Sequence, residues 1–251
     1  MSQHIAESAE IGRNSSWGFN CIIMGKVEIG QDCQIGHNVI IYEGSIIGNG
    51  VRIDDNTIVG KKPLSSPRSI FKVDPNLKPA EIGDLCQIGA NVVIYVQSKI
   101  GNSCLIADSA TIRENVEIGD LNIIGRNVTI ENFTIIGNRN KIETNAYITA
   151  YSEIGDYCFV APAVATSNDN YMARDKERYK HFKGVTIKDG GRIGVNATIL
   201  PGKTIHEDGM VAGGSVVSQD VESEEIWLGN PAKPVGKVSE AQLLKNNLDK
   251  K

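Results

Sequence analysis

The sequence predicts an all-β fold, a parallel β-helix of about ten turns. Three observations predict it: an aliphatic residue at every sixth position, glycine, Asn or Asp at the corners between them, and a low aromatic content of 6%. A period of six fits neither the α-helical turn nor the two-residue alternation of a simple strand. It fits a triangular coil in which each hexad supplies one short strand and one corner, and three hexads complete one turn.

The six-residue pattern runs in three blocks. Every core position, defined as the repeating aliphatic position of the hexad, is Ile or Val except for Trp17. β-Branched side chains suit strands, and glycine, Asn and Asp tolerate the corner conformation. The blocks begin at Ile5, Ile82 and Ile187 and end at Val59, Val160 and Val217.

All five cysteines fall four residues after a core position. This second inward position has little space, so we expect buried apolar thiols. No Cys-x-x-Cys pair occurs, so neither disulfides nor a zinc cluster is expected. The five are Cys21, Cys33, Cys86, Cys104 and Cys158.

Composition argues against several functional classes. A net charge of -4 and a pI of about 5.6 disfavour a nucleic-acid partner, which would require a basic surface. No apolar stretch approaches the roughly 18 residues of a membrane helix, so no membrane partner is expected. The first residues, MSQHIAESAE, lack the pattern of a secretory signal. We therefore expect a cytoplasmic protein.

The hexads predict the domain organisation. Residues 1–221 form the β-helix, interrupted by loops at 60–81 and 167–184 that we expect to leave different edges of the coil. The first loop is either a clasp between protomers or a nucleotide-binding flap. The second is polar, with three aromatic residues and a histidine, and is the better site candidate because loops carry function on rigid scaffolds.

Residues 222–251 form a closing segment and a short helix. Ser239 and Gln242 form an S-x-x-Q capping box. Leu243, Leu244 and Leu248 give this helix one apolar side, and we expect it to cover the final edge of the coil.

The repeat resembles that of the left-handed β-helix acyltransferases, and the handedness comes from this resemblance. Residues 142–174, 185–205 and 228–238 resemble the nucleotide-sugar N-acetyltransferases. The resemblance implies a homotrimer that transfers the acyl group of acetyl-CoA, or of a related acyl-CoA, to the amine of a UDP- or dTDP-linked deoxysugar. The sequence departs from this group where Thr149-Ala150-Tyr151 replaces Tyr-Glu-Gly, a triplet that occurs instead at residues 42–44. The His-Pro step of galactoside- and maltose-type O-acetyltransferases does not occur.

The resemblance assigns Asn168 to contact with the sugar amine. Asp169 either holds the departing proton or caps a loop turn, and His181 either handles a proton or packs the loop. The other histidines, His4, His37 and His206, are expected at the surface. Their spacing does not resemble a γ-carbonic anhydrase site, so no metal is expected.

Further positions are candidates for binding acyl-CoA and nucleotide. Small residues allow a pantetheine chain to approach the backbone, although they also suit coil geometry; these are Gly194, Ala212, Gly213 and Gly214. Lys233 and Lys237 are candidates for the CoA phosphates, or are simply solvated. Arg113, Glu131 and Tyr147 are candidates for the nucleotide sugar. Acyl transfer to a hydroxyl or another small acceptor, and a non-catalytic scaffold, remain alternatives.

Overall fold

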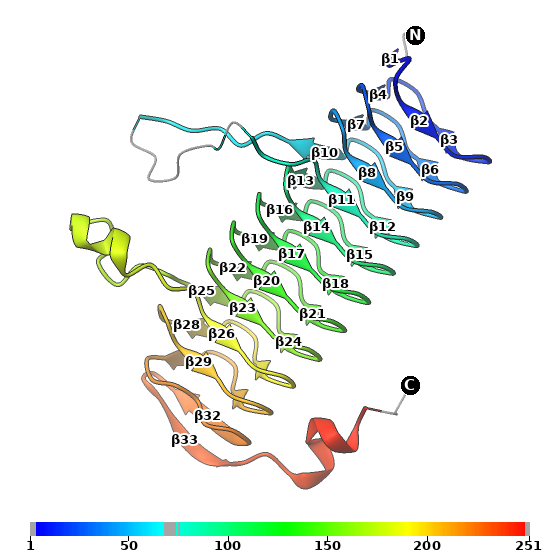
Figure 1. Cartoon of the computed structure of the whole chain (residues 1–251). Coiled ribbons are helices and arrows are strands. Elements are labelled where there is room, and N and C mark those ends of the chain that lie inside the picture. The colour runs from blue at the N-terminus through cyan, green and yellow to red at the C-terminus, as the bar shows by residue number, and fades with distance from the viewer. Residues whose placement is uncertain (1–3, 68–73, 75, 249–251) are drawn as a thin grey trace. The chain divides into compact units, whose positions relative to one another are not determined.

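The computed structural model of the chain describes residues 4–67, 74 and 76–248 (Figure 1). Each predicted core position, from Ile5 to Val217, lies in a short β-strand. The predicted all-β parallel β-helix is confirmed, and the coil is consistent with a left-handed sense. The chain forms two compact units, Met1–Leu121 (unit 1) and Asn122–Lys251 (unit 2), and each contributes strands to three sheets, named A, B and C.

In unit 1 each strand pairs with the strand three places later in the chain, one turn further on. The register places Ile23 beside Ile41 and Ile41 beside Val59, so core positions stack on core positions. Sheet A holds β1 (His4–Ile5), β4 (Ile22–Ile23), β7 (Ile40–Ile41), β10 (Ile58–Lys61), β13 (Val93–Tyr95) and β16 (Thr111–Ile112). Sheet B holds β2 (Glu10–Ile11), β5 (Glu28–Ile29), β8 (Ile46–Ile47), β11 (Glu81–Ile82), β14 (Lys99–Ile100) and β17 (Glu117–Ile118). Sheet C holds β3 (Ser16–Trp17), β6 (Gln34–Ile35), β9 (Arg52–Ile53), β12 (Gln87–Ile88) and β15 (Leu105–Ile106).

Unit 2 repeats this arrangement and adds a closing hairpin. Its sheet A holds β19 (Thr129–Ile130), β22 (Tyr147–Ile148), β25 (Ala165–Thr166), β28 (Thr198–Ile199) and β31 (Val216–Val217). Sheet B holds β20 (Ile135–Ile136), β23 (Glu153–Ile154), β26 (Thr186–Ile187) and β29 (Thr204–Ile205). Sheet C holds β18 (Ile123–Ile124), β21 (Lys141–Ile142), β24 (Phe159–Val160), β27 (Arg192–Ile193), β30 (Met210–Val211), β32 (Glu225–Gly229) and β33 (Ala232–Lys237).

The core of each unit is a stack of aliphatic side chains. Ile94 in unit 1 and Ile148 in unit 2 have no exposed surface. Full burial of one such side chain contributes about 1.5–3 kcal/mol, so the repeated position dominates stability. The five cysteines are free and buried, as predicted. Burial raises the pKa of the Cys158 thiol to about 12.

The corners use a left-handed backbone conformation three residues after most core positions. Asn20 has φ 59° and Asn38 has φ 55°, and their side chains form a ladder in which the Asn20 amide donates to Asn38 at 3.2 Å. Asn adopts this conformation more readily than most residues. Larger residues also occupy it, among them Leu85 at 60° and Phe133 at 58°. The coil therefore imposes the conformation whatever residue stands there.

The second loop begins at residue 167, as predicted, but the six-residue pattern continues through one more strand than Ile and Val mark. Thr166 follows Val160 by six residues and occupies a core position in β25. Its hydroxyl donates to the Tyr147 carbonyl at 3.0 Å and accepts from the Thr149 N–H at 2.8 Å, which allows a polar side chain to be buried there. The Ile and Val positions count 14 hexads between the two loops, which is not a multiple of three and led us to expect different edges. With Thr166 the count is 15, a multiple of three, so the basis of that expectation was wrong. Loop 1 spans residues 62–80 and loop 2 residues 167–185.

The C-terminal segment contains the predicted short helix as two 3₁₀ helices, but that helix neither has the predicted cap nor covers the last strand. Sheet C ends in an antiparallel β32–β33 hairpin, so a strand and not a helix covers its last edge. Two short 3₁₀ helices follow, η2 (Glu240–Gln242) and η3 (Leu244–Asn246), and the Ser239 side chain makes no capping hydrogen bond. Leu243 is buried, and the Leu244 N–H donates to the Asp208 carboxylate at 2.9 Å. Within residues 4–67, 74 and 76–248, no helix has the length and apolar character needed to cross a bilayer.

Candidate functional site

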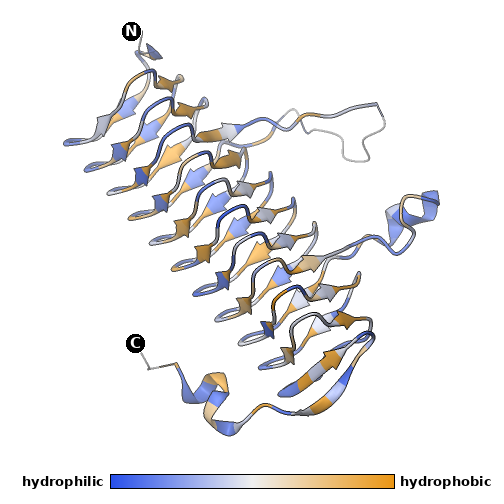
Figure 2. Ribbon diagram, turned by 180° about the vertical axis from the view of Figure 1, so that it is seen from behind, coloured by the Kyte–Doolittle hydropathy of each residue, from blue (hydrophilic) through white to orange (hydrophobic). Residues whose placement is uncertain are grey.

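Loop 2 projects from the coil of unit 2 and carries the 3₁₀ helix η1 (Lys176–Lys180) near its tip (Figure 1). Figure 2 shows η1 as a hydrophilic segment. The Lys183 N–H donates to the Asn168 carbonyl at 3.2 Å, and the Gly202 N–H donates to the Lys183 carbonyl at 3.1 Å. These bonds close the base of the loop and tie it to the next corner of the coil.

Asp169 organises the inside of loop 2. Its carboxylate accepts from the Tyr171 N–H at 2.8 Å, the Ala173 N–H at 3.0 Å and the Arg178 guanidinium at 2.9 Å. Burial opposes ionisation, but the two N–H donors and Arg178 outweigh it and lower the pKa of Asp169. The carboxylate therefore caps the loop turn, the structural role considered for it, and is a weak proton acceptor.

An aromatic cluster completes the loop. The Arg178 guanidinium lies 5.2 Å from the Tyr179 ring and 5.6 Å from the Phe182 ring. The predicted proton handler His181 stacks on Tyr171, with ring centroids 5.7 Å apart, and remains exposed. Sequence reasoning did not single out Arg178, although an arginine nine residues after the loop's first acid was a usable signal.

Asn168 is the predicted residue with the most available side chain. It is half-buried at the loop base, and its side-chain amide has no hydrogen-bond partner among the residues that the structure describes. A side-chain amide supplies both an acceptor oxygen and two donor hydrogens. Asn168 can therefore bind a polar group presented at the corner from which loop 2 leaves.

Two predicted substrate residues lie beside this corner. Tyr147 pairs with Ala165 in sheet A, and its side chain is 40% exposed. The Glu131 N–H donates to the Ile148 carbonyl at 2.9 Å, so Glu131 follows the adjacent strand at the same edge. Tyr147 and Glu131 therefore lie on the two turns of the coil that precede the loop base.

The same edge carries a stacked aromatic pair that sequence reasoning missed. The rings of Phe133 and Tyr151 lie 5.1 Å apart and nearly parallel. Burial raises the pKa of Tyr151. The two residues are 18 positions apart, one full turn of the coil, so the register contained the signal.

Arg113 belongs to unit 1 and is already engaged. Its guanidinium donates to both carboxylate oxygens of Glu114, at 2.9 and 3.0 Å, and lies 5.0 Å from the Tyr95 ring. A diphosphate would have to compete with the almost fully buried Glu114 carboxylate for this guanidinium.

The predicted small residues form one corner of unit 2, between sheets C and A. A Cβ on Gly194 would lie 2.5 Å from the Gly213 nitrogen, so glycine is required there by coil packing. Gly214 has φ +68° and open space where a Cβ would stand, and Gly213 is exposed. The backbone at Ala212, Gly213 and Gly214 can therefore be approached by a thin ligand.

The two predicted phosphate-binding lysines do not converge. Lys233 lies opposite Leu228 near this glycine corner, with its ammonium 3.3 Å from the Gln219 side-chain oxygen. Lys237 lies at the other end of β33 and pairs with Glu225 at 3.2 Å. Lys233 is thus the better placed of the two for an anion at the glycine corner.

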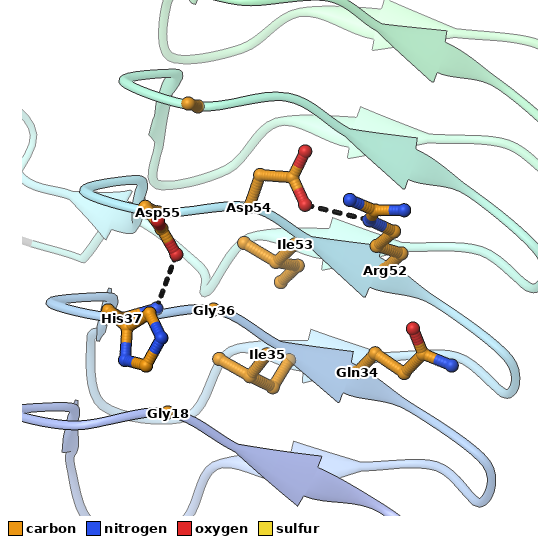
Figure 3. Close-up of a pocket in the computed structure, with 10 residues that line it drawn as sticks. Gly18, Gln34, Ile35, Gly36, His37, Arg52, Ile53, Asp54 and Asp55 are labelled. Carbon is orange, nitrogen blue, oxygen red and sulfur yellow. Dashed lines mark hydrogen bonds and ion pairs between the residues drawn. The ribbon is translucent and has the colours of Figure 1, made fainter.

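Unit 1 has a further cavity of about 530 Å³, lined among others by Gly18, Gly36, His37 and Ala90. Figure 3 shows this cavity with the side chain of His37. Its charged groups are satisfied internally, since Arg52 donates to Asp54 at 2.7 Å. The His37 ring stacks on Phe19 and accepts the Phe19 N–H at 2.8 Å. Across the described residues, no group of three or more His, Cys, Asp or Glu side chains is arranged to hold a metal ion.

Comparison with known proteins gives short sequence matches and a long structural match. A family model described as bacterial transferase hexapeptide (six repeats) matches residues 8–42 and 97–132. A 2,3,4,5-tetrahydropyridine-2,6-dicarboxylate N-acetyltransferase of Staphylococcus aureus is 39% identical over 64 residues, 26% of this chain and 27% of that protein. A mitochondrial γ carbonic anhydrase 2 of Arabidopsis thaliana is 38% identical over 63 residues, 24% of this chain and 23% of that protein.

The chain therefore spans about a quarter of the length of these relatives. The structure of an Arabidopsis UDP-N-acetylglucosamine acyltransferase is similar to this chain, with a TM-score of 0.57 and 19% sequence identity. The alignment covers 94% of this chain and 73% of the Arabidopsis chain. At that identity the likeness shows the fold. The family model thus matches less than a third of the chain, and the structural likeness shows that a similar coil extends over most of it.

Proposed function

We propose that the protein is an acyl-CoA-dependent N-acyltransferase that acts on the amino group of a nucleotide-linked amino-deoxysugar. The observation that carries the proposal is the available Asn168 amide at the base of loop 2, beside Tyr147 and Glu131. The hexapeptide repeats and the partial match to an N-acetyltransferase support acyl transfer. The sequence resemblance over residues 142–174 supports the amino-sugar acceptor.

The acceptor chemistry requires little from the protein. A neutral sugar amine is a good nucleophile, so its correct placement near the thioester carbon supplies much of the rate. The Asn168 side-chain oxygen accepts one amine N–H and orients the nitrogen lone pair. Asp169 holds Arg178 in place and, because its pKa is lowered, remains a carboxylate during the reaction. The proton that the amine nitrogen loses goes to solvent or to His181.

The acyl donor fits the glycine corner of unit 2. An extended pantetheine chain hydrogen-bonds to exposed backbone, and Gly213 and Gly214 are exposed here. Gly214 also has open space where a Cβ would stand, although its own N–H already donates to the Val195 carbonyl. Acetyl-CoA is a co-substrate that supplies the activated acyl group, and Lys233 is placed to meet its phosphates. Backbone N–H groups are the donors that stabilise the tetrahedral oxyanion in acyl transfer.

The proposed assembly is a homotrimer in the cytoplasm. Loop 2 extends away from its own coil and exposes Tyr171, Met172 and Tyr179, with Met172 85% exposed. A second copy covering these side chains would remove apolar surface from water. Five unpaired cysteines are typical of a reducing compartment.

The test is thiol release from acetyl-CoA in the presence of UDP- and dTDP-linked amino sugars. We expect turnover with at least one of them and a decrease of about 10- to 100-fold in Asn168→Ala, because the amine loses its orienting acceptor. The neighbouring exposed residue gives the matched control, Asn170→Ala, which should retain wild-type turnover. An intact acetyl-CoA pool with every amino sugar would refute the proposal.

Transfer to a hydroxyl is the alternative that one observation favours. A hydroxyl needs a general base, and the exposed His181 ring could serve as one. For an O-acyltransferase, His181→Gln would abolish turnover with hydroxyl acceptors. For the proposed N-acyltransferase, the same variant should lose little activity above the pKa of the sugar amine. A non-catalytic scaffold would show neither turnover nor stabilisation by CoA.

A further inference from the structure

A cavity of about 710 Å³ opens in unit 1 where loop 1 leaves the coil. Its volume is within the range of small-molecule sites, about 300–1,000 Å³. Met24, Tyr42 and Gly60 are spaced by one turn of the coil and line one side of it. The returning end of loop 1 adds Leu77 and Pro79. The cavity therefore has an apolar lining with one aromatic ring.

The rim of the cavity is basic. Lys26, Lys61 and Lys62 line it together with a single acid, Glu43. The Lys26 ammonium lies 3.7 Å from the Glu43 carboxylate, so these two charges offset each other. The ammonium of Lys61 lies 5.0 Å from the Tyr95 ring, and neither Lys61 nor Lys62 has an acidic partner among the described residues. Two positive charges therefore remain for a ligand.

Two glycines shape the cavity wall. A Cβ on Gly60 would lie 2.5 Å from the Ser45 hydroxyl and 3.1 Å from the Tyr42 Cβ, so the departing chain crosses close to the tyrosine. A Cβ on Gly44 would lie 2.8 Å from the Pro79 ring. Both glycines have positive φ, 79° and 73°. The wall is therefore held by close packing within the coil corner and the two ends of loop 1.

We propose that this cavity binds a nucleoside diphosphate. The two uncompensated lysines match the charge of a diphosphate better than that of a monocarboxylate, and Tyr42 offers a face on which a planar base can stack. Two sources of this chemistry are available, a UDP or dTDP carrier and the ADP half of CoA, and the cavity is a site additional to the substrate positions proposed in unit 2. The inference does not rest on acyl transfer, because it requires only binding.

Calorimetry and thermal unfolding of the full chain with UDP, dTDP, ADP and CoA test this proposal. We expect at least one to bind and raise the melting temperature, while uridine and inorganic pyrophosphate alone bind at least tenfold more weakly. Preference for UDP or dTDP identifies the nucleotide sugar as the source, and preference for ADP and CoA identifies the acyl donor.

Variants assign the binding to this cavity. The double variant Lys61→Gln/Lys62→Gln should weaken the nucleotide at least tenfold, and Tyr42→Leu should weaken it without changing the affinity for pyrophosphate. Lys99→Gln is the control, since it removes one exposed lysine charge from sheet B of the same unit. Unchanged nucleotide binding in the double variant would overturn the proposal. Binding of decanoate, a fatty acid with one carboxylate, together with no binding of any nucleotide would also overturn it. Nucleotide binding without thiol release would instead count only against the proposed acyl transfer.

Discussion

Removal of the Asp169 carboxylate should open loop 2 without unfolding the coil. The side chains of Asp169 and Arg178 are only 18% and 15% exposed, and the carboxylate accepts three hydrogen bonds. Hydrogen bonds to a charged group contribute about 1.5–3 kcal/mol where water is excluded. At the surface the freed N–H groups regain water, so we expect Asp169→Ala to cost the closed loop about 2 kcal/mol. That energy corresponds to about a 30-fold larger open population.

Chymotrypsin cleavage at Tyr179 measures this population. Where the loop opens and closes faster than it is cut, the cleavage rate follows the opening equilibrium and should increase about 30-fold. Glu177→Gln is the matched control in the same loop, because its ion pair with Lys180 is exposed and should contribute no more than about 1 kcal/mol. Equal cleavage of the two variants would refute the role of Asp169, as would an equally large loss of global stability in urea.

Three further predictions concern loop 2 and the coil. Because the folded pKa of Asp169 is lowered, loop protection should be complete above the ordinary aspartate pKa, about 3.9, and decrease as pH falls through the lower folded value. The rate of loop cleavage by an acid-active protease such as pepsin, measured against pH and corrected for the protease's own profile, tests this, and protection that persists unchanged through strong acid would contradict it. Gly194→Ala should lower the free energy of unfolding in urea by several kcal/mol, because the new Cβ would lie 2.5 Å from backbone. Gly236→Ala is the control and should be nearly neutral, because nothing lies within 4 Å of its Cβ position; equal losses in the two variants would argue against the close approach at Gly194. Thr166→Val should lower the free energy of unfolding by about 1–3 kcal/mol, because the buried Thr149 N–H loses its acceptor. Thr166→Ser keeps a hydroxyl and should retain most of that stability, whereas an equally stable valine variant would show that the hydroxyl is not needed.

The coil was predictable because one physical rule repeats. Each core position needs a β-branched side chain that fills the same space, so Ile and Val mark the strands directly. Thr166 escaped that rule because its hydroxyl is satisfied by backbone groups of the neighbouring strand, a partner that composition does not show. The short C-terminal helix was predicted in the right place and is present as two 3₁₀ helices, but the predicted cap is absent because the Ser239 side chain makes no capping hydrogen bond.

The candidate site was less predictable because its contacts are not periodic. The three contacts of Asp169 and the stacking of His181 depend on how loop 2 folds on itself, which the six-residue register does not constrain. The cavity at loop 1 is an intermediate case. The register places Met24, Tyr42 and Gly60 on one corner, but only the structure shows that Leu77 returns to enclose a cavity there.

Transfer of an isotopically labelled acetyl group from acetyl-CoA most directly tests the proposed chemistry. The purified chain is incubated with a nucleotide-linked amino sugar, and the product is examined by mass spectrometry and NMR. We expect the label on the amino nitrogen, one CoA released for each product, and strong dependence on Asn168. An unlabelled sugar and intact acetyl-CoA, with the β-sheet spectrum of the protein preserved, would contradict the proposed function.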